Sequence, residues 1–500
     1  MTMTSNPAST PLSLLHKIRA AAGERQTTGL PDEDIVRFAA VDASLVEAIE
    51  QAIQGQAELL QAGVDCAVAE TELAARLQRD FVNFYRPEAV NPYVALAAQG
   101  PWVITAHGAV LHDSGGYGML GFGHNPAPVL AAMSRPQVMA NVMTPSFSQE
   151  WFAAAMRREL GHSRAGGCPF HRFICLNSGS EAMTAALRLS DVNAKRMTDV
   201  GARHAGKPIH TLAFQGAFHG RTSRPARVSD SCRGAYEANL ASFRQHDDLL
   251  IVPHNDEQAL VDVFAQAEIS GTFIEAVVLE PVQGEGAPGR ALSRSFYDFA
   301  RRLTAEHGSL LIIDSIQAGL RTHGVLSIVD YPGFADCEAP DIETWSKALN
   351  GGQYPLSVLG LSERAAALYA HGVYGNTMTT NPRALDVAVA ILGLVTPELR
   401  ENVRARGVEF AEKLTAMQSE FPGLIESVEG TGLLLCAELR RDVNVLKKGG
   451  VEEQCRKIGI GVIHGGQNAL RFTPHLWITS EEIDLILEQL RIVFAGLPQA

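Results

Sequence analysis

Two ionisable residues each follow a stretch that is expected to be a short strand, and together they could do chemistry. The apolar run from Leu310 to Ile313 ends at Asp314, and the stretch 341–346 leads to Lys347 and then to a glycine-rich turn. A continuous apolar run is typical of a parallel strand that is buried on both faces. A carboxylate at the end of such a strand is costly to bury unless a cation or a strong hydrogen-bond donor meets it.

Asp314 and Lys347 therefore admit two interpretations. In the first they hold pyridoxal phosphate, with the lysine bonded to the cofactor as a Schiff base and the aspartate keeping the pyridine nitrogen protonated. In the second they form a buried ion pair with no cofactor. These two stretches alone leave both interpretations open.

Two further turns carry residues that suit a cofactor. The stretch 175–182 places Gly179 and Ser180 at the start of an expected helix, where the backbone dipole and unpaired N–H groups favour a phosphate, although an ordinary helix cap has the same composition. In the turn 214–222, Phe218 could lie against a flat ring or could simply be a core residue. Arg221 could bind a carboxylate with two hydrogen bonds or could form a surface ion pair.

Two acidic residues follow another expected strand. Glu280 and Glu285 lie just past the apolar stretch that begins at 276. Open α/β sheets bind their ligands beyond the carboxyl ends of the strands, so we expect both residues at the same sheet edge as Asp314. Gln317, three residues after Asp314, could donate a hydrogen bond to a phenolic oxygen of the cofactor.

The elements that must position these residues alternate regularly along the chain. Alternation of short strands with helices is typical of a largely parallel α/β sheet. We expect strands at 171–176, 210–214, 276–281, 310–314, 341–345 and 356–361, and helices at 180–197, 257–267, 295–307 and 362–370.

The composition excludes several classes of protein. The 500 residues exceed the usual capacity of one core, and 46% hydrophobic with 19% charged residues is ordinary for a globular chain. A net charge of −13 disfavours nucleic acid and anionic membranes as partners, and no apolar run approaches the ~18 residues of a membrane span. Seven dispersed cysteines suggest reduced thiols, and we expect a cytoplasmic protein.

The motifs in this order resemble those of the class III aminotransferases, the ornithine, acetylornithine and ω-amino acid group of fold type I pyridoxal-phosphate enzymes. The resemblance runs from about residue 103 to 493. It rests on NSGSEA at 177–182, the aromatic-His-Gly-Arg turn at 218–221, EPVQGEG at 280–286, the strand-borne Asp with Gln three residues later, SKAL with two glycines at 346–352, GNTMTTNPRA at 375–384 and LRFTPHL at 470–476.

The resemblance implies a fold type I α/β architecture, with a mostly parallel sheet in a large domain and a small α+β domain built from both termini. We accordingly divide the chain into a flexible N-terminus over 1–30, a helical segment with part of the small domain over 31–140, a large cofactor-binding domain over 141–390 and a C-terminal small domain over 391–500.

The resemblance also assigns roles to the cofactor-binding residues. Lys347 matches the Schiff-base lysine, and Asp314 matches the partner of the pyridinium nitrogen. The other implied contacts of pyridoxal 5′-phosphate are the ring-stacking Phe218, the phosphate turn of Gly179 and Ser180, Gln317 near the O3′ atom, and the neighbouring His219 and Glu280. Thr377 matches a threonine that reaches the phosphate of the other subunit, which implies a homodimer with shared sites.

Three residues match the substrate-binding positions of the family. Arg221 resembles the clamp for the carboxylate of an α-amino acid. Glu285 and Arg471 resemble a switch pair, in which the glutamate masks the arginine against ω-amines and releases it for glutamate. The implied partners are a small amino donor and a 2-oxo acid acceptor such as 2-oxoglutarate, bound by an aminotransferase. The same cofactor could instead serve a racemase, an epimerase or a lyase, and a non-catalytic scaffold could keep the fold.

The chain departs from the family pattern close to these residues. Ser315 stands where a glutamate usually follows the strand aspartate, and Ala318 stands where threonine is common. Thr379 and Thr380 replace two glycines, and His475 replaces a proline. None of these changes removes a residue that is assigned to the cofactor.

Overall fold

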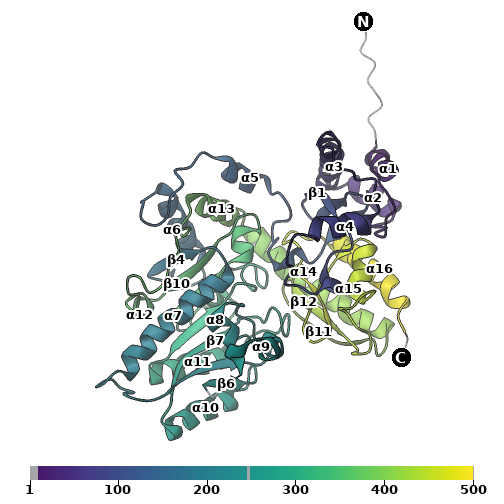
Figure 1. Cartoon of the computed structure of the whole chain (residues 1–500). Helices are drawn as coiled ribbons and strands as arrows, with labels where there is room; N and C mark the ends of the chain where they lie inside the picture. The colour runs from purple at the N-terminus through teal and green to yellow at the C-terminus, as the bar shows by residue number, and fades with distance from the viewer. Residues whose placement is uncertain (1–9, 245–247, 499–500) are drawn as a thin grey trace.

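The computed structural model describes residues 10–244 and 248–498. Figure 1 shows two parts: a large part around one long sheet, and a smaller part in which the purple N-terminal helices lie beside the yellow C-terminal helix.

The large part is organised by a seven-stranded sheet with the order β4-β10-β9-β8-β7-β5-β6. Its neighbouring strands pair in parallel except that β10 is antiparallel to both β4 and β9. The prediction of a mostly parallel sheet is therefore confirmed. The strands are β4 (Arg172–Leu176), β5 (Ile209–Phe214), β6 (Leu249–Val252), β7 (Phe273–Leu279), β8 (Leu310–Asp314), β9 (Ile342–Trp345) and β10 (Ser357–Leu361).

Both faces of this sheet are covered, which is why its central strands are apolar without alternation. Val277 and Ile313 pack into a cluster with the helices α10 and α11, whereas Val278 and Ile312 pack into another cluster with α7. Successive strand residues point to opposite faces, so each face buries every second side chain. The helices of this part are α5 (Ala127–Ser134), α6 (Phe147–Glu159), α7 (Gly179–Thr198), α8 (Ser223–Arg227), α9 (Arg233–Asn239), α10 (Glu257–Ser270), α11 (Arg294–His307), α12 (Glu363–Ala366) and α13 (Pro382–Gly393).

The smaller part joins the two ends of the chain. Its first sheet has the order β1-β2-β3-β13, in which C-terminal β13 pairs in parallel with N-terminal β3. Its second sheet has the order β11-β12-β15-β14. The strands are β1 (Ala95–Gln99), β2 (Trp102–Thr105), β3 (Val110–Asp113), β11 (Ile425–Thr431), β12 (Leu434–Leu439), β13 (Ile460–Gly461), β14 (Ile463–Gly465) and β15 (Ala469–Phe472). The helices are α1 (Pro11–Ala21), α2 (Asp32–Ala39), α3 (Ala43–Gln61), α4 (Glu70–Gln78), α14 (Pro397–Glu420), α15 (Val451–Lys457) and α16 (Ser480–Ala495).

Two details differ from the expected division of the chain. The segment 1–30 was expected to be flexible, but α1 forms because Thr10 caps it and because Leu15 and Ile18 are fully buried in the core; residues 1–9 lie outside the described residues. The boundary expected at residue 390 runs through α13, which packs against α5 and α6 of the large part. The joint between the parts therefore follows Gly393.

Candidate active site

The carboxyl ends of three neighbouring parallel strands meet at one edge of the large sheet. Glu280 directly follows β7, Asp314 ends β8, and Lys347 follows β9 by two residues. They share a cavity of about 190 Å³. Most of the residues predicted to bind the cofactor line this cavity, namely Gly179, Ser180, Phe218, His219, Glu280, Asp314, Gln317 and Lys347, together with Glu285.

Asp314 is 4% exposed and is held by three hydrogen-bond donors. The His219 Nδ1 group donates to its Oδ2 atom at 2.8 Å, and the backbone amide of Ile316 and the hydroxyl of Thr344 donate to Oδ1 at 3.1 and 3.4 Å. Burial lowers the pKa of His219, but the hydrogen bond and the charge of Asp314 outweigh it, so that the pKa is raised. A fixed, hydrogen-bonded carboxylate of this kind suits a partner that carries a proton.

Lys347 sits in an unusual backbone conformation next to this carboxylate. Strand β9 ends at Trp345, and Lys347 opens a short 3₁₀ helix with φ at +42°, a region that few residues other than glycine adopt. Its Nζ group donates to Gln317 Oε1. The pKa of Lys347 is lowered to about 8, because burial and the charge of nearby Arg471 outweigh the opposing charges of Glu285 and Asp314. An amine with a lowered pKa is available as a nucleophile or a base near neutral pH.

Two glycines allow Gln317 to occupy the cavity. A Cβ atom on Gly118 would come within 2.1 Å of Gln317 Nε2, and one on Gly284 would come within 2.4 Å of Gln317 Cγ. The Nε2 donor is buried and has no partner among the described residues. The glycine-rich loop 115–126 brings its backbone against a side chain of the site. Only the tertiary contact reveals this, since Gly118 is far from Gln317 in sequence.

The turn between β4 and α7 presents the start of a helix to the cavity. The side chain of Ser178 caps α7 in a reciprocal arrangement with Glu181, and Gly179 and Ser180 form the first turn. Gly220 lies so close that a Cβ atom there would be 2.6 Å from the hydroxyl oxygen of Ser180. Ser178 also lines the cavity and was not predicted, although its Ser-x-x-Glu spacing is a readable capping signal.

Glu280 fixes the backbone of two loops that surround the cavity. Its carboxylate accepts hydrogen bonds from the amides of Phe218 at 3.0 Å and Gly284 at 2.9 Å. Burial raises the pKa of Glu280 to about 7; the charge of His219 opposes this rise and that of Asp314 adds to it. Glu280 thus lies at the predicted sheet edge, where it holds the Phe218 turn in place.

Glu285 and Arg471 meet as a pair beside the cavity. The Arg471 NH1 group donates to Glu285 Oε2 at 2.8 Å and to the carbonyl of Gly284 at 2.6 Å. Arg471 is 5% exposed, and its Nε donor has no partner within the described part of the chain. Burial would raise the pKa of Glu285, but the charge and the hydrogen bond of Arg471 lower it. Arg471 therefore keeps the Glu285 carboxylate ionised, and its Nε group can donate a hydrogen bond to another acceptor.

The two remaining predicted residues lie outside the cavity. The guanidinium carbon of Arg221 is 5.3 Å from the centroid of the Phe218 ring, and its NH1 group donates to the sulfur of Cys232 at 3.5 Å. Thr377 is exposed, and its carbonyl accepts a hydrogen bond from Asn141 at 3.0 Å. The structure therefore brings Arg221 to the rim of its own site but not Thr377.

The residues of the cavity fit pyridoxal phosphate by their chemistry. The start of α7 offers backbone donors to a phosphate, Asp314 offers a buried carboxylate to a protonated ring nitrogen, and Lys347 offers an amine to an aldehyde. The unpartnered Nε2 of Gln317 is a donor that a ligand oxygen would satisfy.

Comparison with known proteins agrees with this geometry. The model of the class-III aminotransferase family matches residues 84–494. The chain belongs to the class III aminotransferases. The acetylornithine aminotransferase of Xanthomonas axonopodis pv. citri is 30% identical over 430 residues, which cover 83% of this chain and 95% of that protein. The succinylornithine transaminase of Citrobacter koseri is 33% identical over 312 residues, which cover 62% of this chain and 71% of that protein.

Solved structures show the same fold. The ornithine aminotransferase of Toxoplasma gondii ME49 superposes with a TM-score of 0.73 at 22% identity, covering 88% of this chain and 98% of that one. The present protein, a class III aminotransferase, is thus a fold type I enzyme that depends on pyridoxal phosphate. Within the described residues, none of its helices combines the length and the apolarity that crossing a membrane requires.

Proposed function

We propose that this aminotransferase carries its cofactor on Lys347 and moves an amino group between an amino acid or an ω-amine and a 2-oxo acid such as 2-oxoglutarate. The observation that carries the proposal is the single cavity that holds Lys347, Asp314 and the start of α7. Lysine, carboxylate and phosphate cradle are the three groups that the cofactor needs, and they come from three separate strand ends.

The side chains divide the work by their chemistry. The cofactor, when bound, supplies an electron sink for the substrate carbon that loses a proton. Asp314 holds the ring nitrogen in its protonated form, and the neutral amine of Lys347 takes and returns the proton of the substrate carbon. Gln317, whose buried Nε2 donor has no partner among the described residues, would donate to an oxygen of the bound cofactor. His219 keeps Asp314 in place through the 2.8 Å hydrogen bond.

Two arginines are assigned to substrate carboxylates. Arg221 lies at the rim of the cavity, and the described residues offer its guanidinium no carboxylate at ion-pair distance. Arg471 is masked by Glu285, which would have to move before Arg471 could bind the distal carboxylate of glutamate or 2-oxoglutarate. An amine without that carboxylate would leave the hydrogen bond between Arg471 and Glu285 intact. The activities named for the relatives, on acetylornithine and succinylornithine, support small amino acids as the donors.

A homodimer with shared sites accounts for the position of Thr377. Asn141 donates a hydrogen bond to Thr377, and the segment 138–151 around Asn141, together with Met378, carries several exposed apolar side chains. A second copy of the chain would cover them. These side chains are Val138, Met139, Val142, Met143, Phe147, Trp151 and Met378. Mixing inactive Lys347→Ala with inactive Thr377→Asp chains should restore activity, because one site of each mixed dimer would be intact. Failure of exchange-competent mixtures to regain activity would contradict shared sites.

Location in the cytoplasm is part of the proposal. It is supported by the seven cysteines, all of which are unpaired.

Borohydride reduction of the holoenzyme followed by peptide mapping tests the central assignment. The reduced cofactor should stay attached to the peptide that contains Lys347. A label on any other lysine would refute the proposal.

A further inference from the structure

The segment that precedes β1 places two consecutive aromatic residues at the two arginines of the substrate site. The guanidinium carbon of Arg221 lies 5.4 Å from the centroid of the Phe84 ring, in addition to its contact with Phe218. The ring of Tyr85 packs on that of Phe84 with centroids 4.1 Å apart. Burial raises the pKa of Tyr85, the charge of Glu285 raises it further, and those of Arg471 and Arg221 oppose the rise. The phenol thus stands within electrostatic reach of both arginines.

The C-terminal part of the chain holds this segment in place. The buried Arg456 donates to the carbonyl of Ala89 at 2.7 Å, and it is also paired with Glu452. Glu452 in turn binds His464 at 2.8 Å, and the His464 ring meets Tyr85 edge-on with centroids 6.4 Å apart. The two aromatic residues are therefore positioned by contacts between distant parts of the sequence.

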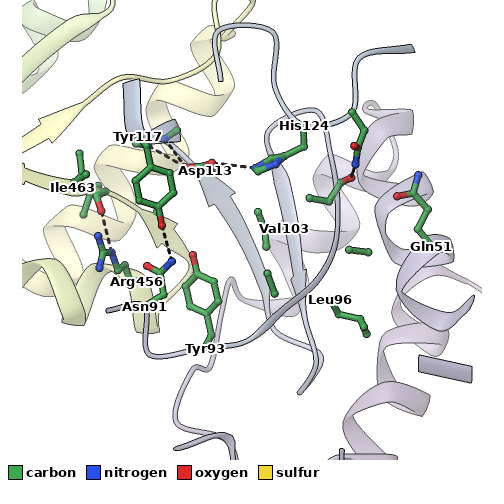
Figure 2. Close-up of a pocket in the computed structure, with 18 residues that line it drawn as sticks. Gln51, Asn91, Tyr93, Leu96, Val103, Asp113, Tyr117, His124, Arg456 and Ile463 are labelled. Atoms are coloured by element: carbon green, nitrogen blue, oxygen red, sulfur yellow. Dashed lines mark hydrogen bonds and ion pairs between the residues drawn. The ribbon is translucent and has the colours of Figure 1, made fainter. Parts of the chain in front are cut away.

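Two hollows, each of about 480 Å³, adjoin this segment and share Asn91, Tyr93 and Tyr117. Figure 2 shows the first hollow, in which the hydroxyl of Tyr117 accepts a hydrogen bond from Asn91 at 3.0 Å. Its charged groups are already paired: Asp113 with His124 and two backbone amides, and Arg456 as described above. This hollow offers no free charge to a ligand.

The second hollow, here called the aromatic groove, has no charged side chain in its lining. It lies between α4 and β1 and is lined by Ala74, Leu77, Gln78, Asn83, Phe84, Tyr85, Ala89, Val90, Asn91, Tyr93, Val94 and Tyr117. Among the described residues, the groove shares no lining residue with the active-site cavity, but residues of the groove contact the surroundings of that cavity at two places. Phe84 and Tyr85 belong both to the groove and to the surroundings of the arginines, and Tyr117 directly precedes Gly118, which packs on Gln317.

We propose that Phe84 and Tyr85 are specificity-determining residues, which select an amino donor that has a carboxylate for Arg221 and a long uncharged tail for the aromatic groove. This inference rests on the proposed function. Phe84 and Arg221 are both exposed, and the Phe84 ring lies against the face of the guanidinium, a cation–π contact that orients the guanidinium toward a carboxylate. The uncharged groove gains apolar burial from an aliphatic tail, whereas a charged tail would lose its hydration there without a partner.

The first test uses Phe84→Ala with three donors: 2-aminohexanoate, alanine and hexylamine, which lacks the carboxylate. The expected result is a roughly 10-fold rise in KM for the two amino acids with little change in kcat, and a clearly smaller rise for hexylamine, which has a tail for the groove but no carboxylate for Arg221. Phe84→Tyr, which keeps a ring over the guanidinium, should restore the wild-type values. Equal effects on all three donors, or no effect on any, would overturn the role of Phe84.

The second test introduces a charge into the groove. Leu77 is 51% exposed and lines the groove, so Leu77→Glu should be tolerated by the fold. The wild type should prefer 2-aminohexanoate over alanine in kcat/KM, and the substitution should lower this preference about 10-fold by weakening the use of 2-aminohexanoate alone. The matched control is Phe81→Glu, because Phe81 is 77% exposed and does not line the groove.

Equal use of the two amino acids by the wild type, or equal loss in Leu77→Glu and Phe81→Glu, would overturn the groove assignment. Borohydride mapping separates these outcomes from failure of the proposed function. A protein that holds the cofactor on Lys347 but gives these contrary results keeps its proposed chemistry and loses only this specificity.

Discussion

The cofactor end and the substrate end of the active site are built in different ways. Asp314 and Glu280 come directly from the ends of adjacent parallel strands, are at most 5% exposed, and are fixed by hydrogen bonds from neighbouring backbone. Arg221 comes from a loop, and Phe84 reaches it from a segment that precedes the first strand of the smaller part. A sheet edge gives little freedom to the groups it carries, so we propose that the reaction takes place where the strands end and that the choice of substrate is made where loops meet.

The two ends also differ in how charge is compensated. At the cofactor end, Asp314 is held by His219, and Lys347 is uncharged at mildly alkaline pH because burial lowers its pKa to about 8. At the substrate end, Arg221 and Arg471 each retain capacity to bind a further acceptor. Substitutions at the cofactor end should therefore abolish all reactions alike, whereas substitutions at the substrate end should change the ratio between substrates.

Lys347→Ala should have the largest effect. Loss of the amine removes both the attachment of the cofactor and the group that moves the proton, and activity with every donor should fall by roughly 10⁴-fold or more. The melting temperature should stay within a few degrees, because alanine fills the same short 3₁₀ turn. Lys195→Ala, on an exposed face of α7, is the matched control and should keep full activity. Retention of substantial turnover in Lys347→Ala would contradict its role.

Asp314→Asn should retain the fold and lose roughly 100-fold or more of kcat with both donor and acceptor. A neutral amide does not hold the ring nitrogen protonated, and each pKa unit lost corresponds to about 1.4 kcal/mol. Single-turnover kinetics measure the proton-transfer step directly. The control is Asp298→Asn, since Asp298 pairs with Arg294 on the surface. Near-normal turnover of the Asp314 variant would exclude this residue as the partner of the ring.

Arg471→Ala should slow one half-reaction and leave the other nearly unchanged, which distinguishes the substrate end from the cofactor end. Loss of a buried charged hydrogen bond typically costs about 2–5 kcal/mol, so the half-reaction with 2-oxoglutarate should slow by about 100-fold while the half-reaction with an amine changes little. Arg491→Ala, which breaks a half-exposed surface pair with Glu420, should change neither. If Arg471→Ala slows both half-reactions equally, Arg471 and Glu285 are not a substrate switch.

Glu343→Gln should give the smallest effect, on stability rather than on rate. Glu343 is fully buried on β9, and burial raises its pKa from 4.5 to about 7 against hydrogen bonds from Ser315 and Ser327. A carboxyl that is protonated more readily in the folded state stabilises the fold at low pH, and this stabilisation is lost as the pH rises from about 4.5 to 7. The wild type should therefore lose about 2 kcal/mol between pH 5 and pH 7 that Glu343→Gln does not lose.

Denaturant titrations at the two pH values measure this difference. Glu306→Gln, at an exposed position on α11, should keep the wild-type pH dependence. If Glu343→Gln lost as much unfolding free energy between pH 5 and pH 7 as the wild type, the titrating group would not be Glu343.

The positions of the residues at the cofactor end could largely be predicted from the sequence. Apolar runs predicted β7 and β8, parallel strands share one carboxyl edge, and Glu280, Asp314 and Lys347 were therefore expected to meet, as the structure shows. The capping residue Ser178 was missed although its spacing to Glu181 is visible. These features are predictable because they depend on short-range periodicity and on the geometry of a parallel sheet.

The substrate end was only partly readable. Family resemblance singled out Arg221, Glu285 and Arg471, but nothing local in the sequence indicated that Phe84 would cover an arginine more than 130 positions later. The contact of Gly118 with Gln317 was equally hidden, because a glycine-rich stretch has the same composition in a connector and in a close approach.

By itself, the sequence determined the α/β class, the strand ends that carry the proposed catalytic residues, and the family with its cofactor. Only the tertiary structure decided that α1 is anchored rather than flexible, that Lys347 adopts a positive φ beside Asp314, and that Phe84 of the aromatic groove contacts Arg221. The reason is physical. Periodicity and backbone geometry act over a few residues and are written in the local sequence, whereas the packing of one loop on another depends on the summed contacts of the whole chain.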